Sequence, residues 1–163
     1  QHGYKVGFKD KTVEILENPH VLPRAYFVEN LIQVSTEDEL IEKIEDSSFD
    51  PRFTAVILAS NTQETEFGKG EITKINYQPN TVTVDLVLSS QGFMVLSDAF
   101  SPGWSAELNG QDVKIHQVNG GVRGVFLPAG NHRLVFKYLP ESFTLGMKIS
   151  LASLAILVIS LIF

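Results

Sequence analysis

Two carboxylates flank the single tryptophan of the chain, and they are the first residues that could carry out chemistry. Asp98 and Glu107 lie on either side of Trp104 in the sequence. Glycoside hydrolases cleave sugar chains with two carboxylates held about 5 to 10 Å apart, so a glycan hydrolase is one interpretation. In the other, Asp98 accepts hydrogen bonds from turn amides or pairs with Arg123, and Glu107 points outward beside Asn109.

Aromatic side chains suggest a second kind of chemistry, because sugar rings stack on aromatic faces. Trp104 could form such a platform together with Tyr26, Tyr77 and Tyr138. A tryptophan that begins a strand of a β-sandwich can equally fill the end of the core. The sequence leaves both interpretations open.

Arg123 is a charged residue in an apolar stretch, since it stands between Val122 and Gly124. Glycine at position 124 lets another part of the backbone approach closely, which would partly enclose the arginine. A buried guanidinium needs a carboxylate partner. Asp98, Trp104 and Arg123 are therefore the candidate binding residues, and no residue is predicted to be catalytic.

Composition excludes several classes of function. The formal net charge is -6, whereas nucleic-acid binding needs a basic face to neutralise phosphates. The chain has no cysteine, so it has no disulfide framework and no thiolate metal site. The four histidines are scattered, and no H-E-x-x-H or G-x-x-x-x-G-K motif occurs. We therefore predict neither a metal nor a cofactor.

The elements that must position these residues are mostly strands. Residues 81–88 alternate apolar and polar side chains, which is typical of a half-buried strand. Ser101-Pro102-Gly103 predicts a tight turn before Trp104, and Asn109-Gly110 predicts a type I′ hairpin turn. Because strand-like runs recur about every ten residues with turn signals between them, we predict a mainly β, antiparallel sandwich that is jelly-roll-like.

Two segments are predicted to be helical. Thr36 and Glu39 form a capping-box pattern, and the apolar residues that follow have helical spacing, so residues 36–45 predict one short helix. Residues 143–163 are apolar apart from Lys148 and a few hydroxyl side chains. At 1.5 Å per residue this run is about 31 Å long, which matches the hydrocarbon core of a bilayer. It predicts a transmembrane helix, with Lys148 extending toward the headgroups.

Residues 1–140 are thus expected to form the sandwich domain and residues 141–163 the C-terminal span. The chain begins at Gln1 without an apolar leader and is still apolar at Phe163. We therefore expect it to be a segment of a longer protein, with a span that continues past residue 163.

A set of short motifs, in this order, resembles the C-terminal part of the YfhO-type bacterial membrane proteins. The motifs are Leu22-Pro23-Arg24-Ala25-Tyr26, Leu96-Ser97-Asp98, Pro102-Gly103-Trp104, Arg123-Gly124-Val125, Leu127-Pro128-Ala129-Gly130-Asn131-His132 and Tyr138-Leu139-Pro140-Glu141-Ser142-Phe143. They are densest over residues 93–150 and run into the apolar C-terminal helix.

The resemblance implies a polytopic bacterial protein whose upstream spans look like a GT-C-type glycosyltransferase that uses lipid-linked sugars. Such proteins are implicated in glycosylating cell-envelope polymers such as lipoteichoic acid. This chain would be a non-catalytic extracytoplasmic accessory domain with the last span, in the bacterial cytoplasmic membrane. Its expected partners are the lipid bilayer, the upstream transmembrane region and a glycan or envelope polymer.

Two alternatives to that function stay open: a purely structural domain that guides assembly, and a membrane-tethered glycan hydrolase that uses Asp98 and Glu107.

The charge pattern bears on the side of the membrane on which the sandwich domain lies. Arg133, Lys137 and Lys148 lie on the domain side of the span, which by charge bias alone favours a cytoplasmic domain. Lysines within a folded domain count little in that rule, so the expected side remains extracytoplasmic.

Overall fold

The computed structural model describes residues 3–60 and 63–162. The described chain is mainly β, with two helices, α1 (Glu37–Glu45) and α2 (Glu141–Ile162). The strands are β1 (Lys5–Lys9), β2 (Glu14–Glu17), β3 (Ala25–Val28), β4 (Asn30–Val34), β5 (Thr54–Leu58), β6 (Gln63–Glu66), β7 (Gly70–Gln78), β8 (Thr81–Leu88), β9 (Gly92–Ala99), β10 (Trp104–Leu108), β11 (Gln111–Val113), β12 (His116–Val118), β13 (Val122–Leu127) and β14 (Gly130–Tyr138).

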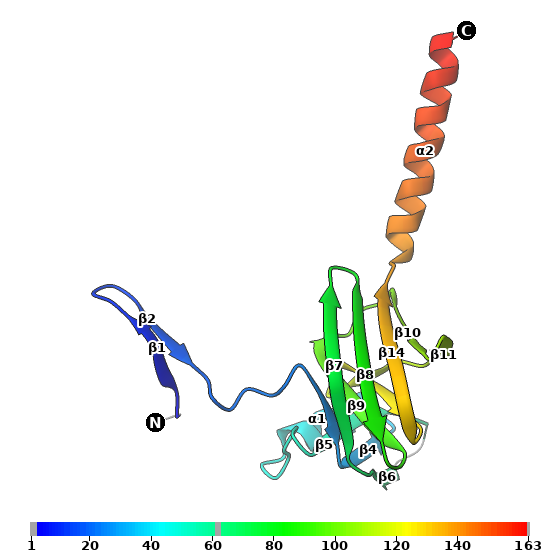
Figure 1. Ribbon diagram of the computed structural model, residues 1–163. Helices are drawn as coiled ribbons and strands as arrows, with labels where there is room; N and C mark the ends of the chain where they lie inside the picture. Colours follow the sequence, from blue (N-terminus) through cyan, green and yellow to red (C-terminus); the bar gives the residue numbers. More distant parts are fainter. Residues whose placement is uncertain (1–2, 61–62, 163) are drawn as a thin grey trace.

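Two large sheets make up the sandwich. The five-stranded sheet has the order β11-β10-β14-β8-β7, and the seven-stranded sheet has the order β3-β9-β13-β12-β5-β4-β6. Strand pairing is antiparallel except between β4 and β5, which α1 connects as a crossover. The predicted mainly β architecture with antiparallel sheets, one short helix and an apolar C-terminal helix is confirmed (Figure 1).

The main core lies between these two sheets. Along β8, Val82, Val84, Leu86 and Leu88 are each at most 3% exposed, whereas Thr81, Thr83 and Asp85 are half-buried on the other face. The predicted period-two pattern is therefore confirmed. Full burial of an aliphatic side chain of this size stabilises the folded state by about 1.5–3 kcal/mol.

A second apolar cluster covers the other face of the seven-stranded sheet. Phe93 is fully buried there, and its ring lies edge-on to Phe126 with the centroids 4.8 Å apart. His116 joins this cluster, with its ring 5.1 Å from that of Phe126. Burial lowers the pKa of His116 below its ordinary value.

Helix α1 begins as the capping-box pattern predicts. The backbone N–H of Glu39 donates to Thr36 Oγ1 at 3.2 Å, and the Glu39 carboxylate accepts a bond from the backbone N–H of Ser35 at 2.8 Å. Leu40 is buried and packs in a small cluster with Val34 and Val56. The cap starts the helix, and the apolar contact holds it against the parallel strands.

Strands β1 and β2 form a separate two-stranded hairpin. Figure 1 shows the hairpin standing apart from the sandwich, joined to it by an extended segment. Because the register shifts between Val6 and Phe8, each face of the hairpin carries one apolar pair, Val6 with Leu16 and Phe8 with Ile15. These four side chains are about half exposed, at 52–55%. The assignment of residues 1–140 to one domain stays a prediction.

Helix α2 leaves the sandwich as a free-standing rod (Figure 1). Within the described residues it is the one helix long and apolar enough to cross a membrane, over Glu141–Leu161 with a mean hydropathy of 1.9. None of that window is buried against the rest of the chain. An all-round apolar surface is costly in water and suits a lipid environment.

Candidate functional site

The candidate residues meet at the end of the sandwich from which α2 leaves. Trp104 opens β10 and pairs across the sheet with Tyr138, the last residue of β14. Both side chains lie on the inner face of the five-stranded sheet, because Ala106 and Phe136, two residues further into the sheet, belong to the main core. The two rings are in contact, with centroids 5.1 Å apart and planes tilted by 39°.

Arg123 points into the same end of the core from the opposite sheet. It is 1% exposed, and its guanidinium carbon lies 3.8 Å from the centre of the Trp104 ring. Its Nη2 lies 3.1 Å from Oδ2 of Asp98, and its Nε donates to the main-chain carbonyl of Asp98 at 3.4 Å. Burial lowers the pKa of Arg123, while the charge of Asp98 opposes that shift. The enclosed arginine thus has the carboxylate partner that its burial requires.

A second arginine completes this cluster. Arg24, directly before β3, donates from Nε to Oδ1 of Asp98 at 2.9 Å, and its guanidinium lies 4.0 Å from the centre of the Tyr77 ring. Asp98 therefore bridges two arginines, each stacked on an aromatic ring. We call Asp98, Arg123, Trp104, Arg24 and Tyr77 the Asp98 clamp.

Some polar atoms of the Asp98 clamp lack hydrogen-bond partners. Among the described residues, two buried side-chain polar atoms have no hydrogen-bond partner, Nη1 of Arg123 and the hydroxyl of Tyr77, and both belong to it. Burial also raises the pKa of Tyr77. Each unpaired buried polar atom costs about 1–3 kcal/mol, so the clamp carries a desolvation cost that apolar residues in its place would avoid.

The two carboxylates of the hydrolase alternative are not brought together. Glu107 forms an ion pair with Lys137, whereas Asp98 lies on the other sheet and engages the two arginines. With each carboxylate neutralised by its own basic partner, the geometry does not support the hydrolase interpretation.

The aromatic platform considered as one interpretation of Trp104 is assembled only in part. Trp104 contacts Tyr138, but Tyr26 packs with the second apolar cluster on the other face of the seven-stranded sheet. The structure thus brings Asp98, Trp104 and Arg123 together, and their role in binding a ligand stays a prediction. Sequence reasoning missed Arg24, which stands 74 residues before Asp98 and has no local signal of this contact.

The joint between the sandwich and α2 is short and is held by contacts with Gly103. Gly103 has a φ of +101°, as its predicted turn position requires, and its carbonyl accepts the backbone N–H of Leu139 at 2.8 Å. A Cβ at position 103 would lie 2.8 Å from Cα of Pro140. The carbonyl of Pro140 in turn accepts the N–H of Phe143 in the first turn of α2. Only Leu139 and Pro140 therefore separate β14 from α2.

A cleft of about 790 Å³ lies at this joint, and we call it the junction cleft. Aromatic, hydroxyl and carboxylate side chains contribute to its wall. The residues that line it are Ser101, Pro102, Gly103, Trp104, Ser105, Tyr138, Leu139, Pro140, Glu141 and Ser142.

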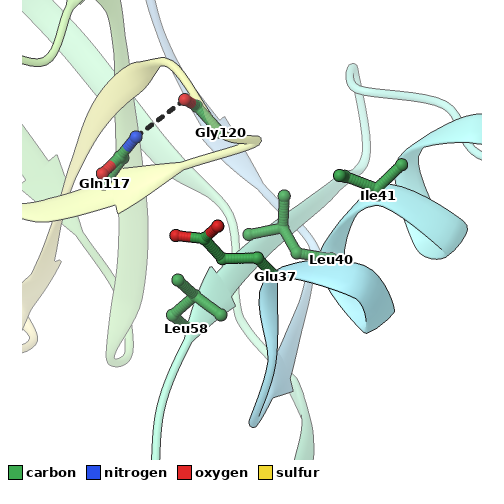
Figure 2. Close-up of a pocket in the computed structure, with 6 residues that line it drawn as sticks. All are labelled: Glu37, Leu40, Ile41, Leu58, Gln117 and Gly120. Carbon is green, nitrogen blue, oxygen red and sulfur yellow. Dashed lines mark hydrogen bonds between the residues drawn. The ribbon is translucent and has the colours of Figure 1, made fainter.

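A smaller cavity of about 280 Å³ lies between α1, the end of β5 and the turn from β12 to β13. Figure 2 shows the Glu37 carboxylate beside Leu40 and Leu58. The side-chain amide of Gln117 donates to the carbonyl of Gly120 at 2.7 Å and is thereby occupied. This cavity does not gather the convergent polar groups of a typical binding site.

The histidines do not form a metal site in the part of the chain that the structure describes, where no three His, Asp or Glu side chains are grouped to hold an ion. His132 contacts the Asn109 side chain at 2.9 Å and lies 3.1 Å from the carbonyl of Pro128. His116 belongs to the aromatic cluster, and His2 lies outside the described residues.

Comparison with known proteins places this chain among bacterial membrane proteins. The family described as "Bacterial membrane protein YfhO" matches residues 58–150. A relative, "Uncharacterized protein YfhO" of Bacillus subtilis (strain 168), is 22% identical over 158 residues, which is 95% of this chain but 16% of the relative. No solved structure matches. Since the family match covers more than half of the sequence and includes the joint and the start of the apolar helix, the chain belongs to the YfhO family of bacterial membrane proteins.

Proposed function

We propose that this chain is a non-catalytic accessory module that a polytopic membrane protein holds at a fixed position over the bilayer. The observation that carries the proposal is the short joint of two residues between the sandwich and α2. Gly103 bonds to Leu139 and leaves no room for a side chain beside Pro140. A domain joined to its span in this way keeps its height and angle above the lipid.

The Asp98 clamp adds to this role. It links the segment before β3, through Arg24, to the residues beside the joint, through Trp104. The chain segments that enter and leave the sandwich are thus both fastened at its membrane-facing end. The clamp thereby fixes the positions of these two segments relative to each other.

We further propose that the complete protein is a GT-C-type glycosyltransferase that uses lipid-linked sugars and modifies a cell-envelope polymer such as lipoteichoic acid. In this proposal the sandwich lies on the extracytoplasmic side of the cytoplasmic membrane and packs near the upstream transmembrane region. The family membership and the apolar helix support a membrane location. The resemblance of the motifs over residues 93–150 supports the finer assignment.

Loosening the joint in the complete protein tests the proposed function. Insertion of two glycines between Leu139 and Pro140 leaves the sandwich core intact while freeing its orientation. We expect the protein to accumulate normally in the membrane and the glycosylation of the envelope polymer to fall. Insertion of two glycines after Gly110, at the exposed turn between β10 and β11 with open space around it, serves as the matched control and should leave glycosylation unchanged. Normal glycosylation with the loosened joint would refute the positioning role.

A purely structural module that guides assembly is the second candidate function. It is favoured by the clamp, in which side chains from distant parts of the sequence are mutually buried. Under this alternative, loosening the joint lowers the amount of protein in the membrane together with its activity. The same experiment therefore separates the two candidates.

The side of the membrane can be tested separately, because the chain has no cysteine. A cysteine at the exposed position Gly121 should react with a membrane-impermeant thiol reagent on intact cells. Reaction only after the cells are opened would place the sandwich in the cytoplasm.

A further inference from the structure

We propose that the junction cleft binds the sugar headgroup of a membrane lipid. The proposal rests on the proposed function for the location of the cleft, and it adds a ligand to that location. It follows from three features of the structure: the position of the cleft along the span, the chemistry of its wall and the arrangement of charges around it.

The first feature is position. Glu141 is both a lining residue of the cleft and the first residue of α2. Glu141 and Ser142 are polar, and the apolar run of α2 begins directly after them at Phe143, as it does where a spanning helix enters the hydrocarbon core. When α2 spans the bilayer, its first turn therefore lies at the headgroup layer, and the cleft opens where lipid headgroups are.

The second feature is the wall. Trp104 and Tyr138 form a contacting aromatic pair along the cleft, and aromatic rings of these two types are suited to the boundary between apolar and wet environments. Ser142 adds a hydroxyl to the wall, and Ser101 and Ser105, whose hydroxyls donate to the carbonyls of Pro102 and Lys137, add hydroxyl oxygens that can accept hydrogen bonds. Rings beside hydroxyls match the apolar faces and the equatorial hydroxyls of a sugar.

The third feature is charge. Glu141 is the one charged side chain among the residues that line the cleft, all of which the structure describes. A carboxylate accepts hydrogen bonds from hydroxyls but repels a phosphate. The Glu141 carboxylate also lies at the N-terminus of α2, where it offsets the positive end of the helix dipole that would otherwise attract an anionic ligand.

The nearby basic residues do not reverse this preference. Arg123 and Arg24 both lie against Asp98, and Lys137 is paired with Glu107. Nη1 of Arg123 has no partner, but Arg123 is 1% exposed and does not line the cleft. Lys148 does not line the cleft either, because it lies about two turns further along α2 than Glu141. Phosphate recognition uses arginine or lysine groups that are free to donate. The cleft is therefore suited to a neutral, hydroxyl-rich headgroup rather than to that of an anionic phospholipid.

The single tryptophan of the chain makes binding directly measurable, because Trp104 lies in the cleft wall. The test uses the full chain in nanodiscs of phosphatidylglycerol, with a glucosyl diacylglycerol added in increasing proportion. We expect a saturable change in tryptophan emission with the glycolipid. Soluble glucose or maltose, added in place of the glycolipid, distinguishes a free sugar from one carried by a lipid.

Two variants and two matched controls locate the effect. Glu141→Gln should weaken the apparent affinity about tenfold, the effect of losing one hydrogen bond to a charged group, and Tyr138→Leu should weaken it as well. Glu71→Gln and Tyr4→Leu change the same residue types at exposed positions outside the cleft and should leave the affinity unchanged. Glu141 is exposed, so Glu141→Gln should keep the fold. It therefore remains a valid test even where Tyr138→Leu unfolds the protein.

Several outcomes would overturn the proposal. An equal emission change when further phosphatidylglycerol is added in place of the glycolipid would mean that no sugar is recognised. An equal response to soluble sugar would mean that no lipid is needed. An affinity for the glycolipid that Glu141→Gln leaves unchanged would place binding elsewhere. None of these outcomes bears on the positioning role, which the loosened joint tests without a ligand.

Discussion

Replacing Asp98 with asparagine should destabilise the sandwich far more than an ordinary surface substitution. The Asp98 side chain is 16% exposed and Arg123 is 1% exposed, so the substitution leaves a buried guanidinium without its carboxylate. Removing one partner of a buried ion pair costs about 3–5 kcal/mol of unfolding free energy. Asp98→Asn also removes the charged acceptor of Arg24, which is exposed and adds at most about 1 kcal/mol.

The matched control is Glu107→Gln, which breaks an exposed ion pair with Lys137. Its expected cost is about 0–1 kcal/mol. Urea unfolding of the full chain in detergent micelles, followed by the emission of Trp104, measures both values. The double variant Asp98→Asn with Arg123→Met should recover much of the loss, because it no longer buries an unpaired charge. Equal costs for Asp98→Asn and Glu107→Gln would refute the description of the clamp as a buried ion pair.

Three further predictions concern the joint, the helix cap and pH. Gly103→Ala should lower the unfolding free energy by about 1–3 kcal/mol, because it strains a positive φ and brings a Cβ against Pro140, whereas Gly121→Ala has open space and should be near neutral in the same urea assay. Thr36→Ala removes the N-cap acceptor of α1 and should cost about 1 kcal/mol in that assay. Burial lowers the pKa of His116 in the folded state, so the unfolded state takes up a proton first as the pH falls. The contribution of His116 to the unfolding free energy should therefore be constant above pH 6.5, the ordinary pKa of histidine, and decrease as the pH falls below it. Urea unfolding of His116→Phe at the same pH values should show a smaller decrease than the unaltered chain, because the His116 contribution is gone.

Features governed by neighbours in sequence could be predicted from the sequence. The alternation in residues 81–88 and the capping box at Thr36 correspond to β8 and to the start of α1. The hairpin turn at Asn109-Gly110 has positive φ at both residues, 52° and 85°, as a type I′ turn requires. The apolar composition of the C-terminal run predicts α2. In each case the signal is local: the alternation of a strand, the side chain of a helix cap or a residue that tolerates positive φ determines the structure of a few neighbouring positions.

Features that depend on distant contacts could not be predicted in the same way. Strand β4 (Asn30–Val34) lacks a clear pattern and is held between β5 and β6, so it was not predicted. The approach of Arg24 to Asp98 depends on the pairing of β3 with β9. Tyr26 faces away from Trp104 because that pairing directs its side chain into the second apolar cluster. The candidate residues themselves were identified by type, since a buried arginine needs a carboxylate.

The central claim is that the sandwich is held at a fixed angle on the span, and a distance distribution tests it most directly. Spin labels at Lys74 on β7 and Leu157 on α2, both exposed, can be attached through introduced cysteines because the chain has none of its own. Pulsed electron paramagnetic resonance of the full chain in nanodiscs should give one narrow distance distribution, which broadens when two glycines are inserted between Leu139 and Pro140. A broad distribution in the unaltered joint, equal to that of the glycine variant, would contradict the account.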